Sequence, residues 1–149
     1  MRMKPVATRA TDDILCERWS ERQASRAPDG SMVVVVADDN ERVAEAVAAA
    51  LAASGFVASA VFSGPDMVLR CEVGDVGIAL VDIMMPRYDG FHTAGMMRRL
   101  QTTHDTVLIA YTAPSVGDVA PRSADFDGYC QKGQSIDKVV ELVRSYFPD

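Results

Sequence analysis

The sequence predicts an α/β protein built on a parallel sheet with helices on both faces. From residue 32 onward, short runs of β-branched and other apolar residues alternate with longer segments whose apolar residues recur at helical spacing. The first run, MVVVVA at residues 32–37, is apolar throughout, as strands buried on both faces are. A length of 149 residues suits one domain of ordinary size. Together these observations favour a doubly wound sheet.

The expected elements follow in chain order. Strands are predicted at 32–37, 56–62, 78–82, 107–111 and 127–131, and helices at 41–54, 65–72, 91–101 and 135–147. The first helix is closed by Gly55, a favoured residue after a helix end. A fourth helix between residues 112 and 132 should be brief, irregular or displaced, because Pro114, Gly117 and Pro121 are poor residues for a helix interior.

Residues 1–31 differ in character from the predicted domain, residues 32–149. They lack the strand–helix alternation, and we expect a loosely ordered extension or a short helix that ends in a turn at residues 27–30. Such a helix would carry its apolar residues on one side: Ile14, Leu15 and Trp19. Because the regular pattern begins at Met32, a native start at Met1 or at Met32 is compatible with the sequence.

Composition and charge narrow the functional class. The formal net charge of −6 argues against nucleic-acid binding by general charge attraction. Apolar runs are far shorter than the roughly 18 residues of a membrane-spanning helix, and no signal peptide is visible, so we expect no membrane insertion. The three cysteines (Cys16, Cys71 and Cys130) show no metal-ligand spacing, which favours reduced thiols and a cytoplasmic protein.

Chemically useful side chains follow four of the predicted strands. Asp38 and Asp39 come after the first strand, Asp82 after the third, and Thr112 and Lys132 close the fourth and fifth. In doubly wound sheets, ligands gather at the carboxyl ends of the strands. Three adjacent carboxylates need compensating positive charge, and oxygen ligands suit Mg²⁺ or Mn²⁺. The sequence therefore predicts a divalent cation beside an anionic group at this edge.

Within residues 32–147, a set of motifs occurs in order: VVVVADDN, LVDIMMP followed by YDG, IAYTA and FDGYCQKG. In these motifs the chain resembles the receiver domains of two-component response regulators. Each motif alone is weak, but the set is specific, with Pro86 four residues after Asp82 and Gly90 four after that. The resemblance implies a flavodoxin-like fold of five parallel strands in the order 2-1-3-4-5. It also implies a signalling protein that is not an enzyme.

The resemblance assigns the metal site and the nucleophile. Asp82 looks like the residue that accepts a phosphoryl group from a histidine kinase or a histidine phosphotransfer protein, because a carboxylate can form an acyl phosphate. Asp39 would bind Mg²⁺ (or Mn²⁺) directly, with Asp38 in support. The backbone carbonyl of Met84 would supply a further oxygen.

The resemblance also assigns phosphoryl-binding and switch residues. Lys132 would neutralise the phosphoryl group, and Thr112 and Ala113 would contact its oxygens. Tyr129 matches an aromatic residue that turns inward when Thr112 moves, which would change the surface offered to a downstream protein or to a second copy in a homodimer. Gly133 stands where the family has a proline.

Plainer interpretations of the same residues stay open. Asp39 or Asn40 could cap the first helix, Thr112 could be a turn residue, and Tyr129 could be a strand aromatic without a switching role. At the level of function, the alternatives are a receiver-like module that binds its partner without switching and a small Mg²⁺-dependent phosphohydrolase. The phosphohydrolase is disfavoured because such enzymes place an aspartate two residues after the nucleophile, where this chain has Met84. A nucleotide-binding domain is weaker still, since no Gly-rich phosphate loop is present.

Overall fold

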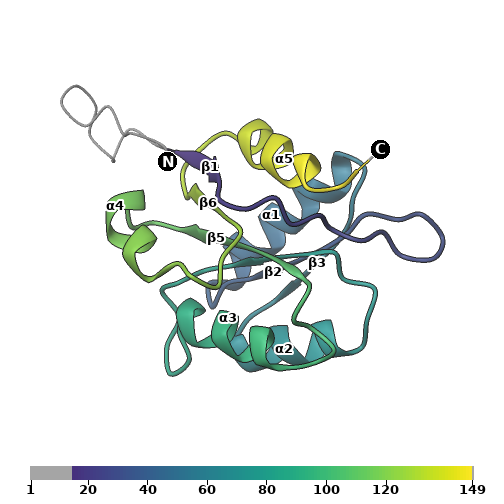
Figure 1. Cartoon of the computed structure of the whole chain (residues 1–149). Coiled ribbons are helices and arrows are strands. Elements are labelled where there is room, and N and C mark those ends of the chain that lie inside the picture. The colour runs from purple at the N-terminus through teal and green to yellow at the C-terminus, as the bar shows by residue number, and fades with distance from the viewer. Residues whose placement is uncertain (1–14, 149) are drawn as a thin grey trace.

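The computed structural model describes residues 15–148, and Figure 1 shows a central sheet between two layers of helices. The strands are β1 (Cys16–Arg18), β2 (Val33–Ala37), β3 (Val57–Val61), β4 (Ile78–Val81), β5 (Val107–Thr112) and β6 (Gly128–Gln131). Their order in the sheet is β1-β6-β5-β4-β2-β3. Strands β2 to β6 are parallel, which confirms the predicted parallel α/β sheet. The predicted count of five strands is wrong by one, because β1 pairs antiparallel with β6.

Helices cover both faces of the sheet, as predicted. They are α1 (Glu41–Ala53), α2 (Gly64–Glu72), α3 (Gly90–Arg99), α4 (Val116–Val119), the 3₁₀ turn η2 (Ala120–Arg122) and α5 (Ile136–Ser145). Successive residues of β2 point to opposite faces, so Val34 joins the core beneath α1 and α5, whereas Val35 joins the core beneath α2 and α3. Leu51 of α1 and Met97 of α3 are fully buried in these two cores. The molecule therefore has one hydrophobic layer on each side of the sheet.

The fourth helix is brief and irregular, as predicted. Helix α4 makes little more than one α-helical turn and continues directly into η2, which contains Pro121. Val116 and Val119 are buried against the core of the α2–α3 side and hold the segment to the domain. Gly117 and Pro121 both oppose a longer helix, because glycine raises the entropy cost of helix formation and proline removes a backbone donor.

The N-terminal segment is extended and not helical in its described part. Residues 16–18 form β1, so the predicted short helix is wrong within residues 15–31, and Ile14 lies outside the described residues. Pairing with β6 satisfies the backbone of these residues better than an isolated helical turn, which is costly to nucleate. The predicted turn at residues 27–30 is confirmed: the Gly30 amide donates to the Ala27 carbonyl at 2.8 Å, with a positive φ at Gly30.

A buried carboxylate fixes this segment to the domain. Asp127, at the start of β6, accepts hydrogen bonds from Ser20 Oγ at 2.7 Å, Arg22 Nε at 3.0 Å and Arg98 Nη2 at 2.6 Å. The backbone amide of Leu108 donates to the same carboxylate at 2.9 Å. The extension is thereby tied to α3, β5 and β6 by charge-assisted hydrogen bonds.

Two of the three cysteines form a disulfide, and the third is a free thiol. Cys16 of β1 faces Cys130 of β6 in the strand register, and the two form a disulfide, so the prediction of reduced thiols is wrong for this pair. The pairing depends on β1 joining the sheet, which no cysteine spacing reveals. Cys71 is a free thiol, and burial raises its pKa to about 12, as expected for an unreactive core cysteine.

Candidate functional site

Three carboxylates meet at the carboxyl ends of β2 and β4. These strands are neighbours in parallel register, with Ala37 opposite Val81, so the residues that follow them lie side by side. Oxygens of Asp38, Asp39 and Asp82 all lie within 4.8 Å of one another. Asp38 and Asp82 are buried, and Asp39 is exposed. This oxygen-only donor set fits a hard divalent cation such as Mg²⁺.

Local hydrogen bonds fix the orientation of the two buried carboxylates. Asp38 Oδ1 accepts the backbone amide of Asn40 at 2.9 Å. Asp82 Oδ1 accepts the backbone amide of Met84 at 3.1 Å and the hydroxyl of Thr112 at 2.8 Å. Asn40, and not Asp39, caps α1 by accepting from the Val43 amide. The carboxylate of Asp39 is therefore not the N-cap of α1.

Lys132 brings positive charge to this acidic cluster. Its Nζ donates to Asp82 Oδ2 at 2.9 Å and to Asp38 Oδ2. Its backbone amide donates to the Thr112 carbonyl at 2.8 Å, which fixes the residue at the end of β6. Burial lowers the pKa of the Lys132 ammonium, but the hydrogen bonds and charges of Asp38 and Asp82 outweigh burial and raise that pKa above its ordinary value. Lys132 is thus held as a cation between the two buried carboxylates.

The loop between β4 and α3 is shaped by a close backbone contact. A Cβ at Gly90 would lie 2.6 Å from the Asp82 carbonyl oxygen and 2.7 Å from Ile83 Cα. Glycine therefore allows the start of α3 to approach the backbone of Asp82. Asp89 caps α3 by accepting the His92 amide at 2.8 Å. The close approach at Gly90 and the Asp89 cap together fix where α3 begins.

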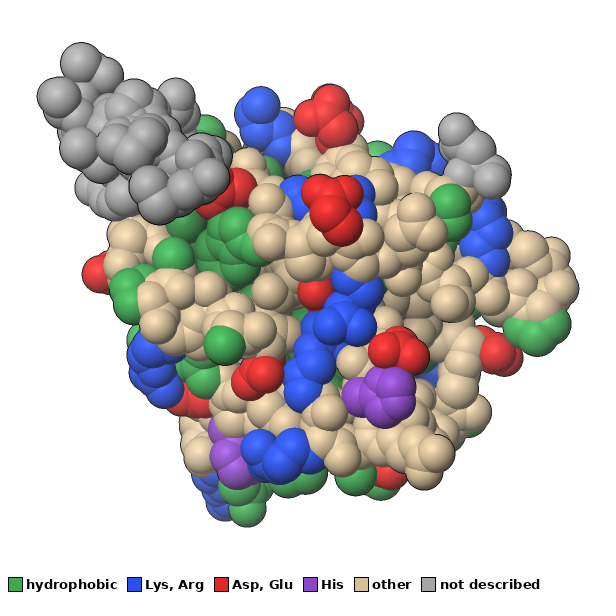
Figure 2. Space-filling view, in the orientation of Figure 1, with side chains coloured by type: hydrophobic (Ala, Val, Ile, Leu, Met, Phe, Trp, Pro, Cys, Tyr) green, Lys and Arg blue, Asp and Glu red, His purple; other side chains and the backbone are tan. Residues whose placement is uncertain are grey.

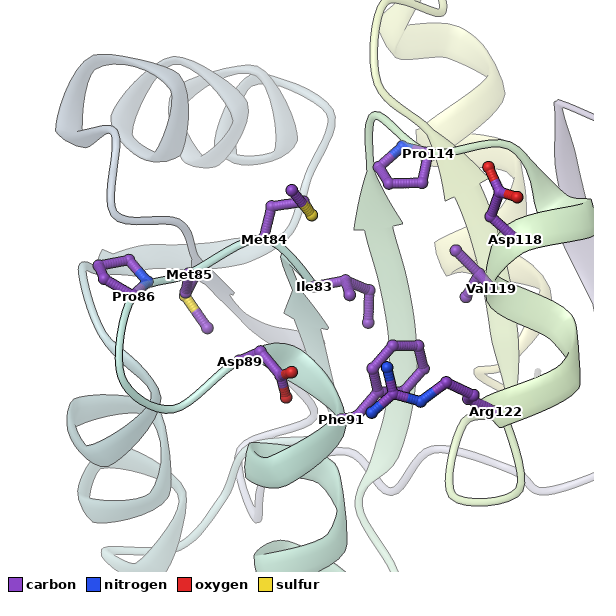
Figure 3. Close-up of a pocket in the computed structure, with 10 residues that line it drawn as sticks. All are labelled: Ile83, Met84, Met85, Pro86, Asp89, Phe91, Pro114, Asp118, Val119 and Arg122. Atoms are coloured by element: carbon purple, nitrogen blue, oxygen red, sulfur yellow. The ribbon is translucent and has the colours of Figure 1, made fainter.

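An open groove of about 560 Å³ lies between this loop and α4, as Figure 3 shows. Met84, Met85 and Phe91 line one side, and Val119 and Pro114 line the other. The guanidinium of Arg122 covers the Phe91 ring, with its carbon 4.0 Å from the ring centre. The groove brings an apolar surface close to the residues that follow Asp82 and Thr112.

The expected switch residues lie on β5 and β6. Thr112 is buried and reaches Asp82 directly, whereas Ala113 is exposed and its carbonyl accepts Gln131 Nε2 at 3.0 Å. Tyr129 is fully buried on β6, and its hydroxyl donates to the Pro114 carbonyl at 2.6 Å. Tyr129 thus contacts the loop that begins at Thr112.

Sequence reasoning missed two contacts of β6. Trp19 stacks on Tyr129 with ring centres 5.8 Å apart, and Cys16 is bonded to Cys130. The signals in the sequence were a single tryptophan and a cysteine in the N-terminal extension, and neither has a spacing that points to β6. Gly133, in place of the family's proline, has a φ of 94°, a conformation that glycine adopts without strain.

Comparisons with known proteins agree with this geometry. A family model described as the response regulator receiver domain matches residues 34–144. The transcriptional regulatory protein HprR of Escherichia coli (strain K12) is 29% identical over 116 residues, which cover 76% of this chain and 51% of that protein. Response regulator RR06 of Streptococcus pneumoniae serotype 2 is 26% identical over 124 residues, covering 78% of this chain and 55% of RR06. The chain spans about half the length of these curated relatives.

Solved structures share the fold. The chemotaxis protein CheY4 of Vibrio cholerae superposes with a TM-score of 0.74 at 15% identity, over 78% of this chain and 99% of that one. The response regulator TrrA of Thermotoga maritima, solved with Mg²⁺ and BeF, gives a TM-score of 0.70 at 24% identity over 78% and 99%. Since the family model matches well over half of its residues, this chain belongs to the response regulator receiver domains of two-component systems.

Proposed function

We propose that the chain is a phosphorylation-dependent signalling switch in which Asp82 accepts a phosphoryl group from a histidine kinase or a histidine phosphotransfer protein. The observation that carries the proposal is the surroundings of Asp82. Its buried carboxylate has a cation, Lys132, on one oxygen and a hydroxyl, Thr112, on the other, beside two further carboxylates. The phosphorylated form would act in the cytoplasm through contacts with a downstream protein or a second copy of the chain.

The proposed reaction is a single phosphoryl transfer to a carboxylate. A carboxylate oxygen of Asp82 attacks the phosphorus of a phosphohistidine, a P–O bond forms, and the P–N bond breaks. The donor histidine leaves with the electron pair and takes up a proton. Lys132 and Thr112 would then offer an ammonium and a hydroxyl to the phosphoryl oxygens, with the Ala113 backbone beside them.

The acidic cluster is the proposed Mg²⁺ (or Mn²⁺) site. Asp39 would bind the cation directly and Asp38 would support it, with Asp82 and the Met84 carbonyl as further oxygen ligands. When bound, the cation would neutralise charge on the transferred group. Lys132 already neutralises part of the negative charge of the cluster, so the cation would offset the carboxylate charge that remains.

Partner classes follow from the surface. Figure 2 shows basic and acidic side chains interspersed on one face, and the whole chain carries a net charge of −6. This supports a protein partner and not nucleic acid. Within residues 15–148, no helix has both the length and the apolar character to cross a membrane.

Intact-mass spectrometry after incubation with acetyl phosphate and Mg²⁺ tests the proposal. The parent should gain the mass of one phosphoryl group, and Asp82→Asn should gain none, because the amide cannot attack phosphorus. Asp89→Asn is the matched control, since asparagine caps a helix as well as aspartate does and Asp89 lies outside the cluster. A phosphorylated Asp82→Asn protein, or an unmodified parent, would refute the assignment.

A second candidate function is a receiver-like module that binds its partner without switching. The observation that favours it is that Tyr129 is fixed at both its hydroxyl and its ring. The hydroxyl donates a hydrogen bond to the Pro114 carbonyl, and the ring is stacked on Trp19. Partner affinity measured with and without acetyl phosphate separates the two functions. The switch requires a change in affinity, and the module does not.

A further inference from the structure

The contact between Trp19 and Tyr129 joins the N-terminal extension to the proposed switch. The two rings lie 5.8 Å apart between centres and are nearly parallel, at 15°. Tyr129 is fully buried, whereas Trp19 is half-buried and packs against the core beneath α2 and α3. The indole thus lies between part of the Tyr129 ring and solvent, and it contributes to the burial of a residue expected to move.

Trp19 is held in place from three directions. Its backbone amide donates to the Asp127 carbonyl at 2.8 Å, at the start of the strand that carries Tyr129. Its indole Nε1 donates to Glu17 Oε1 at 2.6 Å. Three residues earlier, Cys16 is covalently bonded to Cys130, the neighbour of Tyr129. The extension is therefore attached to β6 both at its start, through Asp127, and further along, through Cys130, and it holds the Trp19 indole against that strand.

A continuous set of contacts leads from Trp19 to the phosphoacceptor. The Tyr129 ring touches Trp19, and its hydroxyl donates to the Pro114 carbonyl at 2.6 Å. Pro114 lies two residues after Thr112, whose hydroxyl donates to Asp82 Oδ1 at 2.8 Å. Thr112 and Tyr129 are thus both turned inward in the same structure.

We propose that Trp19 is a positioning residue that holds Tyr129 in its inward arrangement and thereby favours phosphoryl binding at Asp82. The inference rests on the proposed phosphorylation switch. When two interactions favour the same conformation of a protein, each makes the other more favourable, and it does so by the same factor in the equilibrium constant. If phosphoryl binding draws Thr112 and Tyr129 inward, the stack that already holds Tyr129 inward raises affinity for the phosphoryl group.

The test measures the affinity of BeF₃⁻ with Mg²⁺ in three full-length proteins: the parent, Trp19→Phe and Trp19→Ala. NMR amide shifts report the titration. An aromatic pair is worth about 0.5–1.5 kcal/mol, so Trp19→Ala should bind the probe roughly two- to tenfold more weakly. Trp19→Phe retains a stacking ring and should recover most of that loss. Equal affinity in the parent and Trp19→Ala would overturn the inference.

A second readout makes the test independent of phosphoryl binding. Without the probe, hydrogen exchange of the Tyr129 amide should be faster in Trp19→Ala than in the parent or Trp19→Phe. Cys16→Ser, which frees the extension from Cys130, should shift both readouts in the same direction as Trp19→Ala but less. If the parent itself binds no BeF₃⁻, the proposed phosphorylation function fails, and the exchange data alone decide the role of Trp19. Unchanged exchange in Trp19→Ala overturns that role.

Discussion

The acidic cluster and the surface around β6 are built in different ways. In the cluster, Asp38, Asp82 and Lys132 each follow their own strand, and the parallel sheet brings them together. Around β6, the contacts come from the other end of the chain: the disulfide joins residues 114 apart in sequence, and Ser20 reaches Asp127 across 107. The acidic cluster is positioned by strands of the parallel sheet, whereas the surface that would report phosphorylation is completed by the N-terminal extension.

This difference separates the site of the proposed phosphoryl transfer from the surface that would report it to a partner. The arrangement of the acidic cluster needs only the parallel sheet and the loops that leave it. The environment of Tyr129 needs the extension as well, because Trp19 stacks on its ring. Changes to the extension should therefore affect stability and switching while the acidic cluster keeps its arrangement.

The largest effect should come from removing the anchor of the extension. Asp127→Ala leaves the guanidinium of Arg98, whose side chain is only 14% exposed, without its carboxylate partner and removes the hydrogen bonds from Ser20 and Arg22. Burial already lowers the pKa of Arg98, and the Asp127 charge opposes that shift. Loss of one partner of a buried pair costs about 3–5 kcal/mol of unfolding free energy, measurable by urea denaturation.

Asp105→Ala is the control for this prediction. Asp105 also pairs with Arg22, at 3.4 Å, but its side chain is 83% exposed. An exposed pair contributes roughly 0–1 kcal/mol, so this variant should be close to the parent in stability. Equal losses in the two variants would mean that Asp127 is not the anchor.

Much of the fold was predictable, because its signals are local. The buried parallel strands and the short fourth helix follow from apolar runs and from Gly117 and Pro121, and the acidic cluster follows from residues directly after the strands. Strand β1 was not predictable, because three residues with mixed side chains carry no periodicity. The Trp19 stack and the Cys16–Cys130 bond depend on that pairing, so they could not be predicted from the sequence either.

A smaller effect, confined to the acidic cluster, should come from Asp39→Ala. The proposed direct ligand of Mg²⁺ is lost, so affinity for the cation should fall on the order of tenfold or more in a calorimetric titration. Glu41→Ala removes the same charge from the first turn of α1 and lies outside the cluster, so it should bind Mg²⁺ like the parent. If Asp39→Ala binds as the parent does, the acidic cluster is not the cation site.

The most direct test of the link between the two regions is hydrogen exchange across residues 113–126, with and without BeF₃⁻ and Mg²⁺. This segment contains only one α-helical turn and one 3₁₀ turn, so it should open easily before the phosphoryl mimic binds. We predict that the mimic raises protection there more than anywhere outside the strand-end loops, because in the proposed switch phosphorylation would order the segment and would not slide a preformed helix. Equal protection in both states would contradict the account.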